Sequence, residues 1–124
     1  MKQVIRTTDA PSAIGPYSQG IDTGSLVFTS GQLPLNPENG KLETSIEEAT
    51  RQSLKNVRAV LAQAGATLEQ VVKCTVFLKD LNDFAAMNSV YAEYFTENCP
   101  ARSCFQVAKL PMDALVEIEA IAVK

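Results

Sequence analysis

Residues 71–78 read VVKCTVFL, and this run of β-branched, aromatic and other apolar side chains predicts a β-strand. Successive side chains of a strand point to opposite faces. Strict alternation gives one face made of Val72, Cys74, Val76 and Leu78, and a second made of Val71, Thr75 and Phe77. Both sets are largely apolar, so we expect an interior strand that is covered on both of its faces.

An amphipathic helix is predicted before this strand. Residues 45–48 read SIEE, a capping box in which the Ser45 hydroxyl accepts from the amide of Glu48 and the Glu48 side chain reaches back. Apolar residues then recur at helical spacing from Ile46 to Ala64, and Gly65 is a natural stop. The pattern therefore predicts a helix over residues 46–64 with one buried face.

Shorter strands and a second helix complete the predicted order. Strands are expected at residues 4–5, 17–22, 26–31, 101–107 and 115–123, and a second helix carries an apolar stripe from Phe84 to Phe95. The order β-β-β-α-β-α-β-β predicts an α+β fold, a mixed sheet with both helices packed on one face. The other face of the sheet also carries apolar residues, so we expect self-association to bury it.

The composition limits the available chemistry. The chain has 124 residues, the length of one domain, so we expect a single domain over residues 1–124. It has no histidine, which excludes Ser-His-Asp triads, Cys-His pairs and histidine-containing zinc sites. A net charge of −3 argues against binding to duplex nucleic acid, because such proteins need a basic surface. Acid–base catalysis would have to use carboxylates, Lys, Tyr, Cys or water.

The cysteines and the hydrophobic runs indicate the cellular compartment. Cys74, Cys99 and Cys104 show no CxxC spacing, so they predict neither a disulfide framework nor a metal site, and they fit a reducing compartment. The first residues lack the apolar stretch of a signal peptide. The longest hydrophobic runs, such as residues 120–123, have four residues, whereas a membrane span needs about 20. We therefore expect a cytoplasmic protein without a membrane partner.

Charged residues on the last two predicted strands are candidates for chemistry. Alternation puts Arg102, Cys104 and Gln106 on one face of their strand, where a guanidinium suits a carboxylate or phosphate ligand. A surface ion pair explains the same arginine without any ligand. Glu117 and Glu119 share one face of the last strand, where two carboxylates either serve acid–base work or simply face solvent.

Four further polar positions have two interpretations each. Cys104 could act as a nucleophile only if a cation such as Arg102 lowered its pKa, and a small packed thiol is the simpler interpretation. Tyr17, Ser30 and Asn88 could line a site or satisfy backbone groups. No phosphate-binding glycine motif of the GxxxxGK[ST] or GxGxxG type occurs.

Five stretches of the chain resemble a known family. They read APSAIGPYSQG at residues 10–20, FTSGQLP at 28–34, TVFLKDLNDF at 75–84, PARSC at 100–104 and VEIEAIA at 116–122. In this order and spacing they resemble the reactive-intermediate deaminase (RidA/YjgF) family over essentially the whole chain. The connection at 96–99 is shorter than in many members, and Phe105 stands where a smaller β-branched residue is usual. Both departures bear on the substrate range.

The resemblance implies a chorismate-mutase-like α+β fold and a homotrimer with active sites in the clefts between subunits. The implied activity is that of a 2-iminobutanoate/2-iminopropanoate deaminase, which hydrolyses enamines and imines to 2-oxo acids and ammonia. Such substrates, for example 2-aminoacrylate, are released by pyridoxal-phosphate dehydratases and carry a carboxylate. The resemblance implies no metal and no organic cofactor.

The resemblance also implies roles by position. Arg102 matches the arginine that holds the substrate carboxylate, and Glu117 matches the acid that holds the attacking water. The positions that match the lining of the cleft are Tyr17, Ser30, Gly31, Asn88 and Cys104. Two other functions are attached to relatives: a small-ligand-binding regulatory protein without turnover, and a ribonuclease or translation inhibitor. The net charge and the absence of histidine weigh against the ribonuclease.

Overall fold

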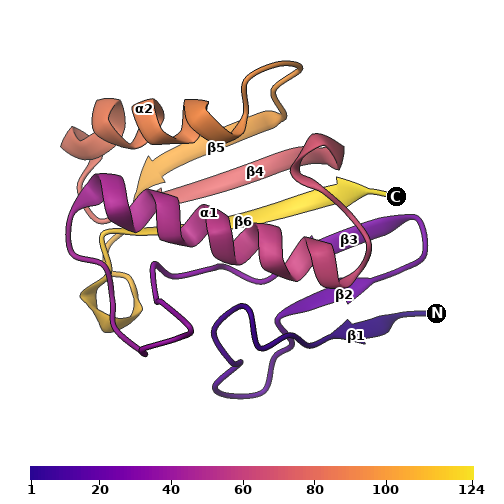
Figure 1. Ribbon diagram of the computed structural model, residues 1–124. Helices are drawn as coiled ribbons and strands as arrows, with labels where there is room; N and C mark the ends of the chain where they lie inside the picture. Colours follow the sequence, from indigo (N-terminus) through magenta and orange to yellow (C-terminus); the bar gives the residue numbers. More distant parts are fainter.

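The computed structural model describes all 124 residues and contains one six-stranded mixed sheet with two α-helices (Figure 1). The strands are β1 (Gln3–Ile5), β2 (Gly20–Asp22), β3 (Leu26–Thr29), β4 (Val71–Leu78), β5 (Ala101–Gln106) and β6 (Val116–Val123). The helices are α1 (Ile46–Gln63) and α2 (Phe84–Tyr94). The strand order is β1-β2-β3-β6-β4-β5, in which β4 and β5 run parallel and the other neighbours run antiparallel. The predicted fold class and order of elements are confirmed.

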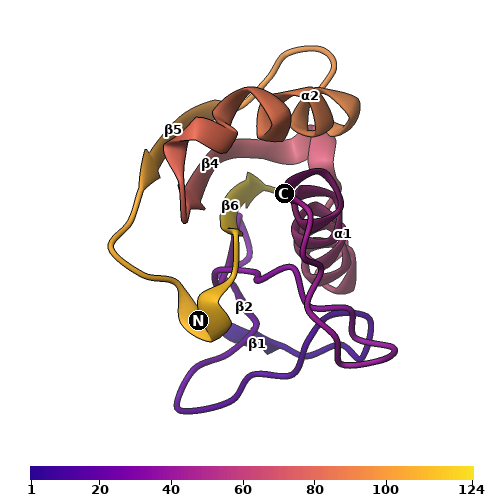
Figure 2. The same ribbon diagram turned by 90° about the vertical axis from the view of Figure 1, so that its left-hand side faces the viewer.

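Both helices lie on one side of the sheet, as Figure 2 shows. Leu54, Val57 and Leu61 of α1 are fully buried in one core with Val76 of β4 and Ile118 of β6. These residues come from the apolar positions of the predicted helix and from alternate positions of the two central strands. The opposite side of the sheet has no helix against it.

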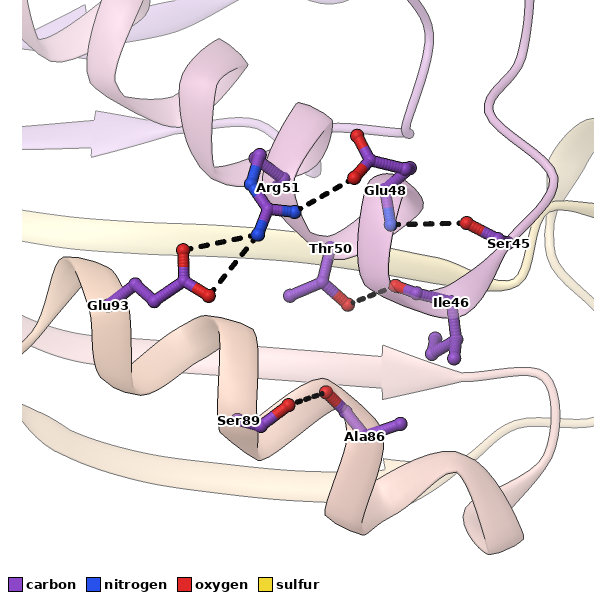
Figure 3. A network of polar contacts seen from close by, with 8 residues as sticks. All are labelled: Ser45, Ile46, Glu48, Thr50, Arg51, Ala86, Ser89 and Glu93. Atoms are coloured by element: carbon purple, nitrogen blue, oxygen red, sulfur yellow. Dashed lines mark hydrogen bonds and ion pairs between the residues drawn. The ribbon is translucent and has the colours of Figure 1, made fainter.

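The start of α1 follows the predicted cap only in part. The Ser45 hydroxyl accepts from the amide of Glu48 at 3.3 Å, as expected. The Glu48 carboxylate does not reach back; it pairs with Arg51 at 3.1 Å. Arg51 also donates to Glu93 of α2 at 3.1 Å, so this network ties the two helices together on the outside of the molecule (Figure 3).

A β-bulge at the start of β4 corrects the predicted alternation. Val71 pairs with Ala122 of β6, yet Lys73 pairs with the adjacent Ile121, so Val72 is an extra residue. Val71 is 5% exposed and Val72 is 44% exposed. The prediction that Val72 shares the core face with Cys74 is therefore wrong, because the bulge reverses the alternation for the first residues of the strand.

Strands β2 and β3 are shorter than predicted, whereas β1 is one residue longer. Residues 17–19 and 30–31 lie outside the two strands, although the Ser30 amide still donates to the Gln19 carbonyl at 2.9 Å. Gln19 is buried and its amide holds the loop in front of it: Oε1 accepts from the Thr7 amide at 2.7 Å, and Nε2 donates to the Thr7 and Pro11 carbonyls at 3.0 and 2.8 Å. The segments that carry Tyr17 and Gly31 are thus ordered loops beside the sheet.

The helix-free face of the sheet carries apolar side chains, as predicted. Phe28, Phe105 and Val123 are 38%, 44% and 41% exposed, and the Phe77 ring packs edge-on against Phe105 with 5.3 Å between ring centroids. The cover of this face by another copy of the chain stays a prediction. No helix combines the length and the apolar character that crossing a membrane requires.

Candidate active site

Glu117 projects into a cleft on the helix-free side of the sheet. Along β6, Val116 and Ile118 point into the core, so Glu117 and Glu119 point the other way, as the alternation predicted. Glu117 lies opposite Phe77 of β4 in the ladder. The cleft has a volume of about 660 Å³ and is lined by 15 residues, among them Tyr17, Ser30, Gly31, Phe77, Glu117 and Glu119. The fold therefore brings together five of the residues singled out in the sequence: Tyr17, Ser30, Gly31, Glu117 and Glu119.

The Glu117 carboxyl has no cation beside it. No arginine or lysine lies within ion-pair distance, and no hydrogen bond reaches its side chain. Burial raises the pKa of Glu117, and the nearby Glu119 carboxylate raises it further. A carboxyl with a raised pKa exchanges protons closer to neutral pH, which is the property that a general acid or base needs.

Gly31 lies directly against Glu117. A Cβ atom at Gly31 would lie 2.7 Å from Cδ of Glu117 and 3.0 Å from its Oε1. Only glycine permits this approach, because carbon atoms in non-bonded contact sit roughly 3.5–4.0 Å apart. The absence of a side chain at Gly31 thus allows the observed position of the carboxyl group.

Tyr17 and Ser30 line the cleft from loops. The Tyr17 ring is 53% exposed and its hydroxyl accepts from the Ile14 amide at 3.4 Å. The Ser30 hydroxyl donates to the Ser18 carbonyl at 2.6 Å. Ser30 therefore fills both of the roles weighed from the sequence: it satisfies a backbone group and borders the cleft.

Arg102 belongs to a second group of residues, between β5 and α2. It pairs in the ladder with Cys74, a core residue, and so projects to the helix side of the sheet. Its Nη1 donates to the Asn88 side-chain oxygen at 2.7 Å, and its guanidinium lies 4.7 Å from the Tyr91 ring centroid and 5.5 Å from that of Phe84. No carboxylate lies within ion-pair distance, so the surface ion pair considered for Arg102 is wrong.

Cys104 follows Arg102 on the same face and packs against the core. Burial raises the pKa of the Cys104 thiol, and Arg102 lowers it by less. A thiol that keeps its proton is a poor nucleophile. The structure therefore favours the packed thiol over the nucleophile.

A single chain does not bring Arg102 and Glu117 together, because they lie on opposite faces of the sheet. Sequence reasoning also missed the aromatic neighbours of Arg102. Phe84 and Tyr91 were assigned only to an apolar stripe, although their spacing from Asn88 on one helix could have indicated a shared face.

Comparison with known proteins decides the family. Residues 7–124 match the family described as Endoribonuclease L-PSP. A RutC family protein of Pasteurella multocida is 54% identical, with 100% of this chain and 99% of the relative covered. A 2-iminobutanoate/2-iminopropanoate deaminase of Escherichia coli K12 is 51% identical, with 100% and 99% covered. The chain belongs to this family, which is also called RidA/YjgF. The predicted resemblance is confirmed.

Solved structures of the RidA/YjgF family share the fold. The crystal structure of Escherichia coli TdcF with bound serine superposes with a TM-score of 0.96 at 50% identity, covering 98% of each chain. In this RidA/YjgF chain Phe105 packs edge-on against Phe77, which lines the cleft, so Phe105 borders the cleft only through that ring.

Proposed function

We propose that the protein is a 2-iminobutanoate/2-iminopropanoate deaminase that hydrolyses imines and enamines such as 2-aminoacrylate to 2-oxo acids and ammonia. One observation carries the proposal: the Arg102 guanidinium and the cleft carboxyl Glu117 both lack an ion-pair partner within the chain. An unpaired arginine suits the carboxylate that every such imine carries. An unpaired carboxyl with a raised pKa suits the movement of a proton.

Hydrolysis of an imine requires few groups from the protein. An enamine first tautomerises to the imine: its carbon gains a proton and its nitrogen loses one, which leaves an electrophilic imine carbon. Glu117 accepts a proton from water as the water oxygen bonds to that carbon, and the proton passes to nitrogen. The hydroxyl proton of the carbinolamine then moves to nitrogen, so that ammonia leaves as the carbonyl forms. One carboxyl contributes about 10²–10⁴-fold to such steps, so the mechanism uses neither a metal nor an organic cofactor.

The proposed site spans two subunits of a homotrimer. Arg102 lies on the helix side of β5, an edge strand, and Glu117 lies on the helix-free side of β6. We propose that Arg102 of one subunit meets Glu117 of its neighbour when the apolar helix-free faces pack together. Symmetric association of this kind repeats the same contact around a closed ring.

Mixed trimers test the shared site. Arg102→Ala and Glu117→Gln chains, each with a strongly lowered kcat/KM alone, are co-expressed and purified together, and kcat/KM is measured. In a site shared between neighbours, about a quarter of the sites in randomly mixed trimers combine an intact Arg102 with an intact Glu117. We therefore expect about a quarter of wild-type activity to return. A mixture as inactive as its components, or a monomer in light scattering, contradicts the shared site.

The relatives support a carboxylate ligand more than an RNA ligand. One relative carries the name of the proposed activity, and TdcF was crystallised with serine, which has a carboxylate. The family description names an endoribonuclease, but the lining of the cleft contains two glutamates, Glu117 and Glu119, and no arginine or lysine, so it offers no basic groove for an RNA backbone. Three free thiols are typical of a reducing compartment, so we propose a cytoplasmic location.

A coupled assay tests the activity itself. A serine or threonine dehydratase generates the imine, and loss of the imine and release of ammonia are followed with and without the purified protein. We expect faster decay with stoichiometric formation of ammonia and the 2-oxo acid. Binding of a 2-oxo acid without faster release of ammonia would instead indicate a regulatory binding protein.

Gly31→Ala is expected to lower kcat by about 10²-fold, because displacing a catalytic group by about 1 Å has an effect of that size. The new Cβ would lie 2.7 Å from Cδ of Glu117 and must push the carboxyl away. The measurement is kcat together with the melting temperature. In a Glu117→Gln background, the same glycine replacement is expected to cause little further loss. A large further loss would show that Gly31 acts in another way.

Glu119→Gln is expected to shift the acidic limb of the kcat/KM profile to lower pH. Glu119 is the smaller of the two causes that raise the pKa of Glu117, and glutamine removes its charge while keeping its shape. The ionised form of Glu117 then persists to lower pH, so activity is retained further into acid. Glu69→Gln, at the opposite end of β4 from Phe77, is the matched control and leaves the limb in place.

A further inference from the structure

Arg102 is a half-buried cation whose partners are all neutral. The Asn88 oxygen accepts one N–H group from Nη1, and the guanidinium carbon lies over the rings of Phe84 and Tyr91. The carboxylates that form ion pairs in this chain belong to Glu48, Glu93, Asp113 and Asp22. None of them lies within ion-pair distance of Arg102. The guanidinium thus keeps its full charge for a ligand, and its position depends on groups that do not compete with an anion.

The groups around Arg102 come from one face of α2. Phe84, Asn88 and Tyr91 are spaced four and three residues apart, so they lie above one another on the helix surface. The helix itself is tied to α1 by the Arg51–Glu93 pair (Figure 3). Three side chains of a fixed helix therefore surround a side chain that rises from an edge strand.

Tyr91 is the neighbour with the closest ring. The guanidinium carbon lies 4.7 Å from its centroid, within the range of a cation–π contact. The Tyr91 ring in turn packs on Phe95, with 4.7 Å between centroids and a 36° tilt. A ring attracts the cation through its face and uses none of the N–H donors along the edge of the guanidinium.

The hydroxyl group of Tyr91 does not account for its contact with Arg102. Tyr91 is 7% exposed, and its hydroxyl lies beside the buried Cys74 thiol, a weak partner that makes no well-directed hydrogen bond with it. The hydroxyl makes no hydrogen bond to Arg102 or to Asn88, so the contact of Tyr91 with the guanidinium comes from the ring.

We propose that Tyr91 is a positioning residue: its ring, backed by Phe95, fixes the plane of the Arg102 guanidinium so that the donors left free by Asn88 meet both oxygens of the substrate carboxylate. This inference rests on the proposed function, in which Arg102 holds that carboxylate. The ring acts on binding through Arg102 and touches neither the substrate nor the reacting atoms.

The test compares kcat and KM of ring-removing and ring-retaining variants in the coupled assay. Tyr91→Leu is expected to raise KM for the imine about five- to tenfold with a small change in kcat, because the orienting contact is lost. Tyr91→Phe retains the ring, so KM is expected to return to the wild-type range. Tyr94→Leu is the matched control. Tyr94 lies on the same helix as Tyr91, and the guanidinium carbon of Arg58 from α1 lies 5.6 Å from the centroid of its ring.

A double-mutant cycle shows whether Tyr91 acts through Arg102. In an Arg102→Ala background, Tyr91→Leu is expected to cause no further loss of kcat/KM. Two results overturn the positioning role of Tyr91: losses that multiply in the double variant, or a Tyr91→Leu variant with unchanged KM while Arg102→Ala is defective. In both cases Arg102 is still supported as the group that binds the carboxylate. If Arg102→Ala is itself fully active, the clamp fails as well. Tyr91→Met refills the volume and replaces Tyr91→Leu if the leucine variant does not fold.

Discussion

Arg102→Ala is expected to lower kcat/KM for imine hydrolysis by about 10- to 150-fold, the equivalent of the roughly 1.5–3 kcal/mol that a charge-assisted hydrogen bond contributes. The loss should appear mainly in KM, because the guanidinium holds the carboxylate both before and during the reaction. The fold should survive, since the arginine has no ion pair and lies on an edge strand. Stopped-flow decay of the dehydratase-generated imine measures the effect.

Two further variants define the result at this position. Arg102→Lys keeps the charge but cannot form a planar fork or stack on Tyr91, so it is expected to recover only part of the loss. Arg58→Ala removes an arginine that also contacts a tyrosine ring of α2 but lies on α1, and it is expected to leave kcat/KM unchanged. Full acceleration by Arg102→Ala would mean that another group holds the carboxylate.

Glu117→Gln is expected to lower kcat by about 10²–10⁴-fold, the size of a general acid–base contribution. Glutamine fills the same space in the cleft but cannot accept a proton from water. KM should change little, since the carboxyl makes no ion pair and the proposed clamp lies elsewhere. Single-turnover measurements separate the chemical step from binding. A kcat lowered by no more than about fivefold would show that Glu117 does not take part in the chemical step.

The same substitution is expected to stabilise the protein at neutral pH. Burial and Glu119 raise the pKa of Glu117 in the folded state, so the folded protein holds this proton more tightly than the unfolded chain. Stability is greatest while the carboxyl is protonated and falls as pH rises through the raised value. Glu117→Gln has no charge to bury. Its melting temperature should exceed that of wild type above this pH and approach it below the ordinary pKa of 4.5.

Local patterns were sufficient for much of the fold. The SIEE cap and the apolar spacing that follows it place α1 within one residue of its predicted end, because capping and helical periodicity act over a few neighbouring residues. Alternation along β6 likewise assigned Glu117 and Glu119 to one face. The β4 alternation failed at Val72, since a bulge depends on the pairing with β6 and has no signature in residues 71–78 themselves.

The candidate site was also predictable only in part from the sequence. Residue types and order indicated Arg102 and Glu117 as the groups for a carboxylate and a proton, and a family resemblance assigned their roles. Neither said that a single chain keeps them on opposite faces of its sheet. That separation follows from two long-range pairings, in which β5 lies parallel to β4 beneath α2 and β6 lies antiparallel to β4 with its carboxylates turned away from the helices.

Residue order alone was therefore enough for the elements, the apolar helix-free face and the chemistry of single side chains, since these depend on neighbours in the chain. Only the tertiary structure decided which groups share a space: Glu117 with Gly31 and Tyr17 in the cleft, and Arg102 with Asn88 and Tyr91 under α2. The physical reason is that alternation states which side chains point the same way along one strand, whereas strand order and register determine what they meet.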